Sequence, residues 1–202
     1  PTTIGGWQEE RVASGAIVRR YKGSDVGLRY WRELVVAPVW YPPRATPPDD
    51  LVGVFDGRRR LKEELIGPSY RSAYGMVMLV HERDLGAERR EDRWYDAGIR
   101  THGSANYGSI LKGSSHGCHR LYNVHVLRLA TYILKTQRYA ARGEIDEALR
   151  RVVRARGRRW DLEREQRGFL FELEPPIPVE VLPGTPVGAR KTPPKGARWP
   201  TR

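Results

Sequence analysis

The sequence predicts a mainly β, β-sandwich-like fold that carries a few helices. Two observations support this prediction. Short segments rich in Val, Ile and Trp recur along the chain between Gly and Pro residues, which is typical of strands. After Cys118 the apolar spacing changes to the three- and four-residue period of a helix. This combination favours a sandwich-like sheet over a doubly wound α/β fold.

Several strands are expected before Cys118. Residues 12–19 and 33–40 are rich in Val, Ile and Trp and are bounded by Gly or Pro, and further strands are expected over residues 75–81 and 96–102. The last of these strands would deliver His102 at its end. The intervening residues 82–95 are crowded with charge and indicate a hairpin excursion.

An amphipathic helix is expected after Cys118. Asn123 is suited to be its N-cap. Apolar residues follow at helical spacing and define one face: Val126, Leu127, Ala130, Ile133 and Leu134. Cys118 would then lie just before a helix N-terminus, whose partial positive charge favours the thiolate.

The later part of the chain predicts a second helix, two strands and a tail. The helix is expected over residues 144–156 and would end at Gly157. Strands over residues 169–173 and 179–182 flank two prolines and would close the sheet. Residues 183–202 are rich in Pro, Gly and basic residues and poor in apolar ones, so they predict a tail or linker.

Length and composition indicate one globular domain, residues 1–182, followed by the tail. Domains average ~150 residues, so a chain of 202 residues fits one domain with an extension. No apolar run approaches the ~20 residues that a membrane-spanning helix requires. The chain begins Pro1-Thr2-Thr3 without a Met, so we expect an upstream segment, which could include a signal peptide.

The net charge of +12 favours a polyanionic partner or surface. Residues 149–159 hold six arginines, and residues 183–202 hold five basic residues and no acidic one. The regular interleaving of aromatic and basic residues found in nucleic-acid binders is missing from these runs, so no nucleic acid is expected. We interpret the arginine run as a solvated helix face. The tail could hold the protein near an anionic wall or membrane surface.

Cys118 lies in the sequence Ser115-His116-Gly117-Cys118-His119-Arg120, and it is the only cysteine of the chain. It cannot form an internal disulfide. A thiol becomes a nucleophile when a nearby base lowers its pKa, and His102, in Thr101-His102-Gly103, could supply that base. A glycine before the thiol permits a tight turn whose N–H groups can face an oxyanion. The pattern predicts a cysteine acyl-transfer site.

Two other interpretations of these residues stay open on the sequence alone. A lone cysteine is often a small buried apolar residue of a core. A metal site could be formed by His102, His116, Cys118 and His119, but ligands one residue apart are an awkward start for a tetrahedral shell. No second Cys or His pair completes such a shell. We therefore expect no metal and no cofactor.

The same residues resemble the active-site signature of the L,D-transpeptidases (the YkuD-type catalytic domain). The family pattern is a His-Gly at a strand end, a short connection, and Ser/Thr-x-Gly-Cys followed by Arg or Asn. Residues 98–106 and 114–121 match it, and the resemblance is dense over residues 98–125. The Pro-Thr-Pro-x-Gly-x-Phe stretch of many members is not visible, and residues 46–48 and 70–75 are the nearest candidates. His119 stands where the family more often has an apolar residue.

The resemblance implies a role for each residue of the signature and an L,D-transpeptidase catalytic fold for the domain. Cys118 would be the nucleophile, His102 the general base, and the Gly103 carbonyl the group that orients the imidazole. Ser115, His116 and Gly117 would shape the oxyanion loop, in which amides of the Gly117–Cys118 turn stabilise the tetrahedral intermediate. Arg120 would hold a stem carboxylate. For Arg120, a surface position beside the helix start remains the alternative. His81, His119 and His125 are expected to be structural or exposed.

The resemblance also implies the reaction, which belongs to cell-wall biogenesis. Cys118 would attack the carbonyl at the L-centre of diaminopimelate in a peptidoglycan tetrapeptide stem and release D-alanine. The amine of a second stem would resolve the thioester and cross-link two diaminopimelate residues. Water as acceptor would make the enzyme an L,D-carboxypeptidase. Such an enzyme works in the cell envelope or periplasm of a bacterium and is acylated by carbapenems. A cysteine amidase or peptidase of another family, and a non-catalytic basic module that binds wall or nucleic acid, are the alternatives.

Overall fold

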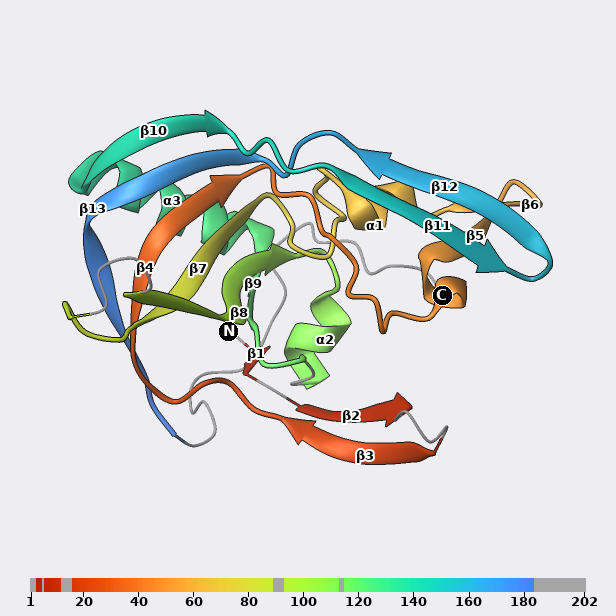
Figure 1. Ribbon diagram of the computed structural model, residues 1–202, viewed down its shortest axis with the longest axis horizontal. Helices are drawn as coiled ribbons and strands as arrows, with labels where there is room; N and C mark the ends of the chain where they lie inside the picture. The colour runs from red at the N-terminus through yellow and green to blue at the C-terminus, as the bar shows by residue number, and fades with distance from the viewer. Residues whose placement is uncertain (1–2, 5, 12–15, 89–92, 113–114, 184–202) are drawn as a thin grey trace.

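A seven-stranded mixed sheet forms the centre of the molecule, as the computed structural model shows (Figure 1). The structure describes residues 3–4, 6–11, 16–88, 93–112 and 115–183. The strands lie in the order β1 (Thr3–Ile4), β9 (His119–Tyr122), β8 (Trp94–Ser104), β7 (Val77–Asp84), β4 (Gly27–Val36), β13 (Phe169–Val181) and β10 (Arg138–Glu144). Among the described strand pairs, β8 and β9 alone run parallel.

The main core lies between this sheet and the helix α3 (Asn123–Thr136) (Figure 1). Its buried residues come from three strands and one face of the helix: Leu34, Val77, Leu79, Val126, Ala130, Ile133 and Leu173. The spacing of the three helix residues in this core matches the amphipathic pattern expected from the sequence, which explains why α3 packs here. The helix expected after Cys118 is therefore confirmed, and so is the mainly β architecture.

Asn123 does not cap this helix. The N-cap position is Tyr122, which has extended backbone angles, and no side chain caps the helix end. Asn123 is instead fully buried. Its side-chain oxygen accepts the N–H of Met76 at 3.1 Å, and its side-chain nitrogen donates to the carbonyl of Tyr70 at 2.9 Å. The residue therefore joins the start of α3 to the segment that enters β7.

A lobe with its own apolar core extends from one end of the sheet (Figure 1). We call it the hairpin lobe; it comprises residues 39–66 and 149–164. It contains the 3-10 helix η1 (Pro48–Leu51), β5 (Val52–Phe55), β6 (Arg58–Leu61), α1 (Glu63–Ile66), β11 (Leu149–Ala155) and β12 (Arg158–Arg164). Its buried residues are Val39, Leu51, Leu61, Ile66, Val153 and Leu162. Two chain segments far apart in sequence therefore share one core.

Two smaller elements complete the described part of the chain. The strands β2 (Gly6–Arg11) and β3 (Ile17–Lys22) form a separate antiparallel pair. The short helix α2 (Tyr107–Lys112) follows β8 and buries Tyr107 and Ile110 against Tyr122. None of the described helices is long and apolar enough to span a membrane.

The helix expected over residues 144–156 is wrong, because this segment forms parts of β10 and β11. Burial alternates along β11: Val153 and Ala155 are buried, whereas Val152 and Arg154 are exposed. Such a two-residue period belongs to a strand. Gly157 does not end a helix but forms, with Arg156, a two-residue hairpin turn in which both residues have positive φ.

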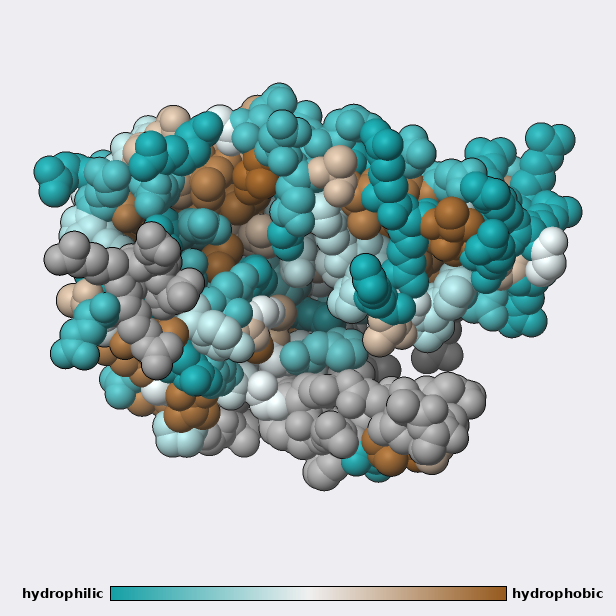
Figure 2. Space-filling model, viewed as in Figure 1, coloured by the Kyte–Doolittle hydropathy of each residue, from teal (hydrophilic) through white to brown (hydrophobic). Residues whose placement is uncertain are grey.

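The arginines of residues 149–159 therefore lie on a hairpin and not on a solvated helix face. Arg150, Arg154 and Arg158 are exposed on it, and Arg58, Arg59 and Arg60 of β6 are exposed in the same lobe. Figure 2 shows the resulting hydrophilic surface over β11, β12, β5 and β6. These arginine side chains are exposed to solvent as expected, but they lie on strands and not on a helix.

The remaining boundaries differ in smaller ways. Of the four strands expected before Cys118, the first shifts to β3 and the second to β4, and the others match β7 and β8. Residues 12–15 of the first lie outside the described residues. The hairpin expected over residues 82–95 is the connection of the antiparallel β7–β8 pair: β7 runs to Asp84, β8 begins at Trp94, and residues 89–92 lie outside the described residues.

The late strands and the tail also depart from expectation. The two late strands are one, β13, whose register against β4 shifts around Pro175-Pro176. In the described part of the chain the strands form one large sheet and three pairs, and not two facing sheets. Of the expected tail, residues 183–202, the structure describes residue 183, and residues 184–202 lie outside the described residues.

The alternation on β11 predicts that substitution of two neighbouring valines changes the free energy of unfolding by different amounts. Val153 is 1% exposed in the core of the hairpin lobe, and Val152 is 42% exposed. Val153→Ala should lower the free energy of unfolding by about 2 kcal/mol, because it removes buried methyl groups and leaves a cavity. Val152→Ala should change it by less than about 0.5 kcal/mol. Denaturant unfolding of both variants checks this, and equal losses would contradict the strand assignment.

Candidate active site

The parallel pair β8–β9 brings the residues of the signature together. His102 pairs in register with Arg120, and Thr101 pairs with His119. Cys118 immediately precedes β9. Because side chains alternate between the two faces of a sheet, Arg100 and His102 share one face with Cys118 and Arg120. We call this face the reaction face.

His102 is held in one orientation and one tautomer. It is 2% exposed, and its Nδ1 lies 2.7 Å from the carbonyl oxygen of Gly103. A carbonyl only accepts hydrogen bonds, so Nδ1 carries the hydrogen and Nε2 keeps a free lone pair. The ring of Tyr74 packs edge-on against the imidazole, with centroids 5.2 Å apart. Burial lowers the pKa of His102 to about 3, so the imidazole is neutral near pH 7 and can accept a proton at Nε2.

The thiol of Cys118 is half-buried and neutral at rest. Its Sγ lies 3.8 Å from the carbonyl oxygen of Gly98. Burial raises the pKa of the thiol above its ordinary value, and three groups oppose this shift: the backbone N–H of Arg100 and the guanidinium groups of Arg100 and Arg120. The help expected from a helix N-terminus is absent, because β9 separates Cys118 from α3. The resting pair is a thiol and an imidazole, and not a thiolate and an imidazolium.

The turn before the nucleophile is fixed by a buried serine. Ser115 is 1% exposed; its hydroxyl donates to the carbonyl of Cys118 at 2.8 Å and accepts the N–H of Gly117 at 3.2 Å. Gly117 has a φ of +107°, and a Cβ there would lie 2.9 Å from the carbonyl oxygen of Gly23 and from Cδ1 of Ile99. Only glycine fits this position.

The hydrogen bond to Ser115 changes the expected oxyanion site. The N–H of Gly117 donates to the Ser115 hydroxyl, so of the two amides of the Gly117–Cys118 turn that of Cys118 is the candidate to face an oxyanion. His116 belongs to the same turn and is exposed. The structure thus places Cys118 and His102 on one face of the β8–β9 pair, Gly103 bonded to the imidazole and Ser115 and Gly117 in the turn before Cys118, whereas His116 is exposed.

Arg120 lies on the reaction face and not at the protein surface beside the helix start. It is half-buried and pairs in register with His102. Burial lowers the pKa of its guanidinium, and the nearby Cys118 opposes that shift. Arg100, on the neighbouring strand, is 7% exposed and donates to both carboxylate oxygens of Asp96 at 2.6 and 2.5 Å. The site therefore presents two guanidinium groups beside the nucleophile.

Sequence reasoning missed Arg100, Tyr74 and Asn123 as parts of the site. Of the two candidate stretches for the missing family motif, residues 70–75 lie here, because Tyr74 packs on His102. A Cβ on Gly75 would lie 2.7 Å from the carbonyl carbon of Gly103. This close approach requires a glycine at position 75. Residues 46–48 lie instead in the hairpin lobe.

The other predicted histidines do not join the reaction face. His119 points to the opposite face, where it hydrogen-bonds Ser24 and packs on His81. His81 is buried in β7, and His125 of α3 packs against Tyr122. Among the described residues, no group of three or more His, Cys, Asp or Glu side chains could hold a metal ion. The opposite orientations of His119 and Cys118 also separate two ligands of the metal site considered above.

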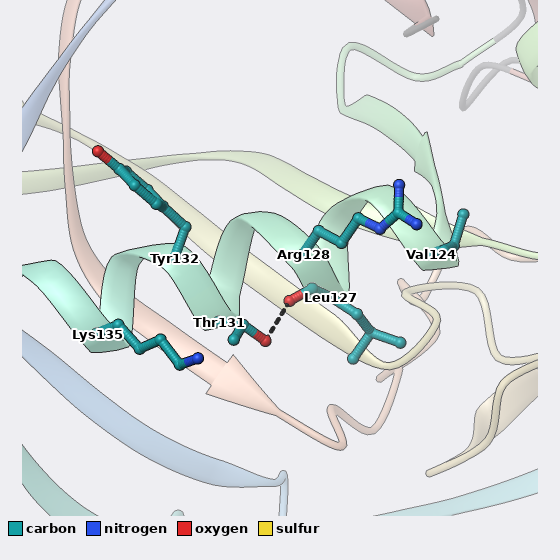
Figure 3. A pocket seen from close by; sticks show the side chains of 6 residues that line it. All are labelled: Val124, Leu127, Arg128, Thr131, Tyr132 and Lys135. Carbon is teal, nitrogen blue, oxygen red and sulfur yellow. Dashed lines mark hydrogen bonds between the residues drawn. The ribbon is translucent and has the colours of Figure 1, made fainter.

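A surface hollow of about 430 Å³ lies elsewhere, along the outer side of α3 (Figure 3). It is lined by Val124, Leu127, Arg128, Thr131, Tyr132 and Lys135. None of these side chains belongs to the reaction face. The chemistry of the site therefore rests on the β8–β9 pair and not on this hollow.

Comparison with known proteins finds no matching family model, no matching curated protein and no matching solved structure. The resemblance to the L,D-transpeptidases therefore rests on the signature residues of the sequence.

A neutral resting pair predicts the pH dependence of alkylation. The pKa of the Cys118 thiol is raised, so the thiolate fraction falls below that of an ordinary cysteine at every pH beneath the pKa. Iodoacetamide reacts with the thiolate, so its rate should rise close to tenfold per pH unit between about pH 7 and 9. The alkylation rate is measured by quenching the reaction at timed intervals and quantifying the product by mass spectrometry. The unfolded chain in urea is the control and should react with an ordinary cysteine profile. A plateau below pH 7 would show an ion pair instead.

Proposed function

We propose that this protein is a cysteine acyltransferase of the L,D-transpeptidase type that acts on peptidoglycan stem peptides. One observation carries the proposal: the Nδ1 of His102 is bonded to the backbone carbonyl of Gly103, on the strand that runs parallel to the one beginning after Cys118. This is the orientation by a carbonyl, without a carboxylate, that the resemblance implies. The signature of residues 98–125 supports the same class.

The geometry supports a general-base mechanism. The free lone pair of His102 Nε2 takes the thiol proton as Sγ of Cys118 attacks the carbonyl of the donor stem. The N–H of Cys118 stabilises the oxyanion that forms. His102, now protonated, gives its proton to the departing amine of D-alanine, and a thioester remains. The amine of a second stem then attacks the thioester, and His102 removes its proton as the thiolate leaves.

The reaction face suits a substrate that carries carboxylates. Stem peptides bear a carboxylate on diaminopimelate and another on the terminal D-alanine. Arg120 lies beside His102, and a guanidinium binds a carboxylate through two parallel hydrogen bonds. Arg100 is paired with Asp96. We assign the stem carboxylate to Arg120, because it lies in register with His102 on the reaction face. The cell envelope of a bacterium, where such stems occur, is the proposed site of action.

The proposal is tested with purified muropeptides that carry tetrapeptide stems. Mass analysis should show dimers with released D-alanine, whereas trimmed monomers would indicate that water is the acceptor. A carbapenem should add its mass covalently at Cys118. Absence of all three products, together with salt-sensitive binding to wall or nucleic acid, would favour a non-catalytic basic module instead.

Substitution of either central residue should remove most of the turnover, and Cys118→Ser should do so with little effect on folding. Cys118→Ser should lower turnover by at least about 10³-fold, because a serine hydroxyl is a far weaker nucleophile beside an unassisted imidazole. His102→Ala should lower it by about 10² to 10⁴-fold. Circular dichroism should show that Cys118→Ser folds as the parent does. Wild-type turnover by either variant would refute the assignment of the pair.

Substitution of Arg120 should remove a preference for carboxylate substrates. Arg120→Gln should lower kcat/KM about tenfold or more for a stem with a free carboxylate and much less for the same stem with that carboxylate amidated. The matched control is Arg71→Gln, because Arg71 is an exposed arginine paired with Glu64. Equal losses on both substrates would show that Arg120 does not recognise the carboxylate.

A further inference from the structure

A row of polar side chains crosses the sheet behind the nucleophile, on the face opposite the reaction face. Trp31 Nε1 donates to His81 Nε2 at 2.9 Å, and the same Nε2 lies 2.7 Å from the Thr101 hydroxyl. Thr101 lies 3.4 Å from Nδ1 of His119, whose Nε2 lies 3.1 Å from the hydroxyl of Ser24. Ser24 donates to the carbonyl of Gly117 at 2.5 Å. The row therefore ends on the peptide that joins Gly117 to Cys118.

The hydrogens along this row can be assigned from donor and acceptor chemistry. An indole N–H only donates, so His81 Nε2 carries no hydrogen and also accepts the Thr101 hydroxyl. At the other end a carbonyl only accepts, so the single hydroxyl hydrogen of Ser24 goes to Gly117. Ser24 must then accept from His119, whose Nε2 carries the hydrogen.

The longest distance in the row fits this assignment. Burial lowers the pKa of His119, so the ring is neutral near pH 7 and its Nδ1 has no hydrogen. The Thr101 hydrogen is already given to His81, so two lone pairs face each other across 3.4 Å. The bond from His119 to Ser24 and the bond from Ser24 to Gly117 remain the directed part of the row.

The Ser24 bond sets the direction of the Cys118 amide. The peptide between Gly117 and Cys118 is trans, and in a trans peptide the carbonyl and the following N–H point in opposite directions. A carbonyl held by Ser24 on the rear face therefore turns the Cys118 N–H away from that face. This is the amide that Ser115 leaves available for an oxyanion.

We propose that Ser24 and His119 are positioning residues that aim the Cys118 N–H at the oxyanion during acyl transfer. This inference rests on the proposed acyl-transfer chemistry but not on a peptidoglycan substrate. Ser24 lies in the link between β3 and β4, so a segment 94 residues before the nucleophile fixes its oxyanion donor.

The experiment compares two reactions of Cys118 that differ in one respect. Attack on p-nitrophenyl acetate forms a carbon–sulfur bond, breaks the bond to nitrophenolate and passes through an oxyanion, with the thiol proton taken by His102. Alkylation by iodoacetamide displaces iodide at a saturated carbon and forms no oxyanion. Ser24→Ala should slow acylation about tenfold or more and change alkylation by less than about twofold.

Variants of His119 give a second, independent readout. His119→Leu should slow acylation as Ser24→Ala does, and His119→Gln, which keeps an N–H donor, should restore most of the rate. Because both residues act through one carbonyl, the double variant Ser24→Ala/His119→Leu should be no slower than Ser24→Ala. Thr131→Val is the matched control, since it removes a hydroxyl-to-carbonyl bond on α3 and should change neither rate.

Three results would overturn the inference: wild-type acylation by Ser24→Ala, equal losses of acylation and alkylation, or multiplied losses in the double variant. A parent protein that is acylated by the ester but neither cross-links nor trims muropeptides would refute the peptidoglycan substrate alone. The two failures are therefore distinguishable.

Discussion

The parallel register of β8 and β9 is the constraint on which the site depends. With Thr101 opposite His119, the side chains of His102, Cys118 and Arg120 lie on one face, and those of Thr101 and His119 lie on the other. A slip of one residue would exchange the two faces of β9 and carry the thiol away from its base. The closely packed glycines on both strands allow no such slip, because a Cβ at Gly117 or Gly103 would meet neighbouring atoms at 2.9 or 2.1 Å.

Asn123 fixes the third element of the site. A Cβ on either Gly75 or Gly103 would lie only 2.1 Å from the side-chain oxygen of Asn123, which is too close. Both positions must therefore be glycine for the Asn123 amide to fit between them. The bonds from Asn123 to Met76 and Tyr70 hold the segment that carries Tyr74 against His102. A buried amide with both its groups bonded is rigid as well as costly to replace. Helix α3 thereby supports the imidazole, although it gives no dipole to the thiol.

The sequence predicts the local parts of this site and not the distant ones. Cys118, His102 and Gly103 can be predicted from the sequence because they belong to one short motif within one supersecondary unit. Tyr74 and Ser24 reach the site only through strand pairing over many residues, which no local pattern encodes. The hairpin turns differ in the same way: Asp56-Gly57, between β5 and β6, is a strong turn signal, whereas Arg156-Gly157 is a weak one inside a run of arginines. There the two-residue alternation of β11 outweighs a composition that suits a helix.

The neutral resting pair explains why the support around the site is so extensive. Burial moves the pKa of Cys118 up and that of His102 down, so both shifts oppose charge separation before substrate arrives. In the proposed reaction, charge would develop only as the thiol attacks, on the imidazole and on the substrate oxygen. Interactions made only at that moment raise the rate without tightening ground-state binding. In the proposed acyl transfer, the Gly103 carbonyl would stabilise the protonated imidazole and the Cys118 amide would stabilise the substrate oxygen. The hydrogen bonds of these two peptide groups to His102 and Ser24 would then contribute to the rate.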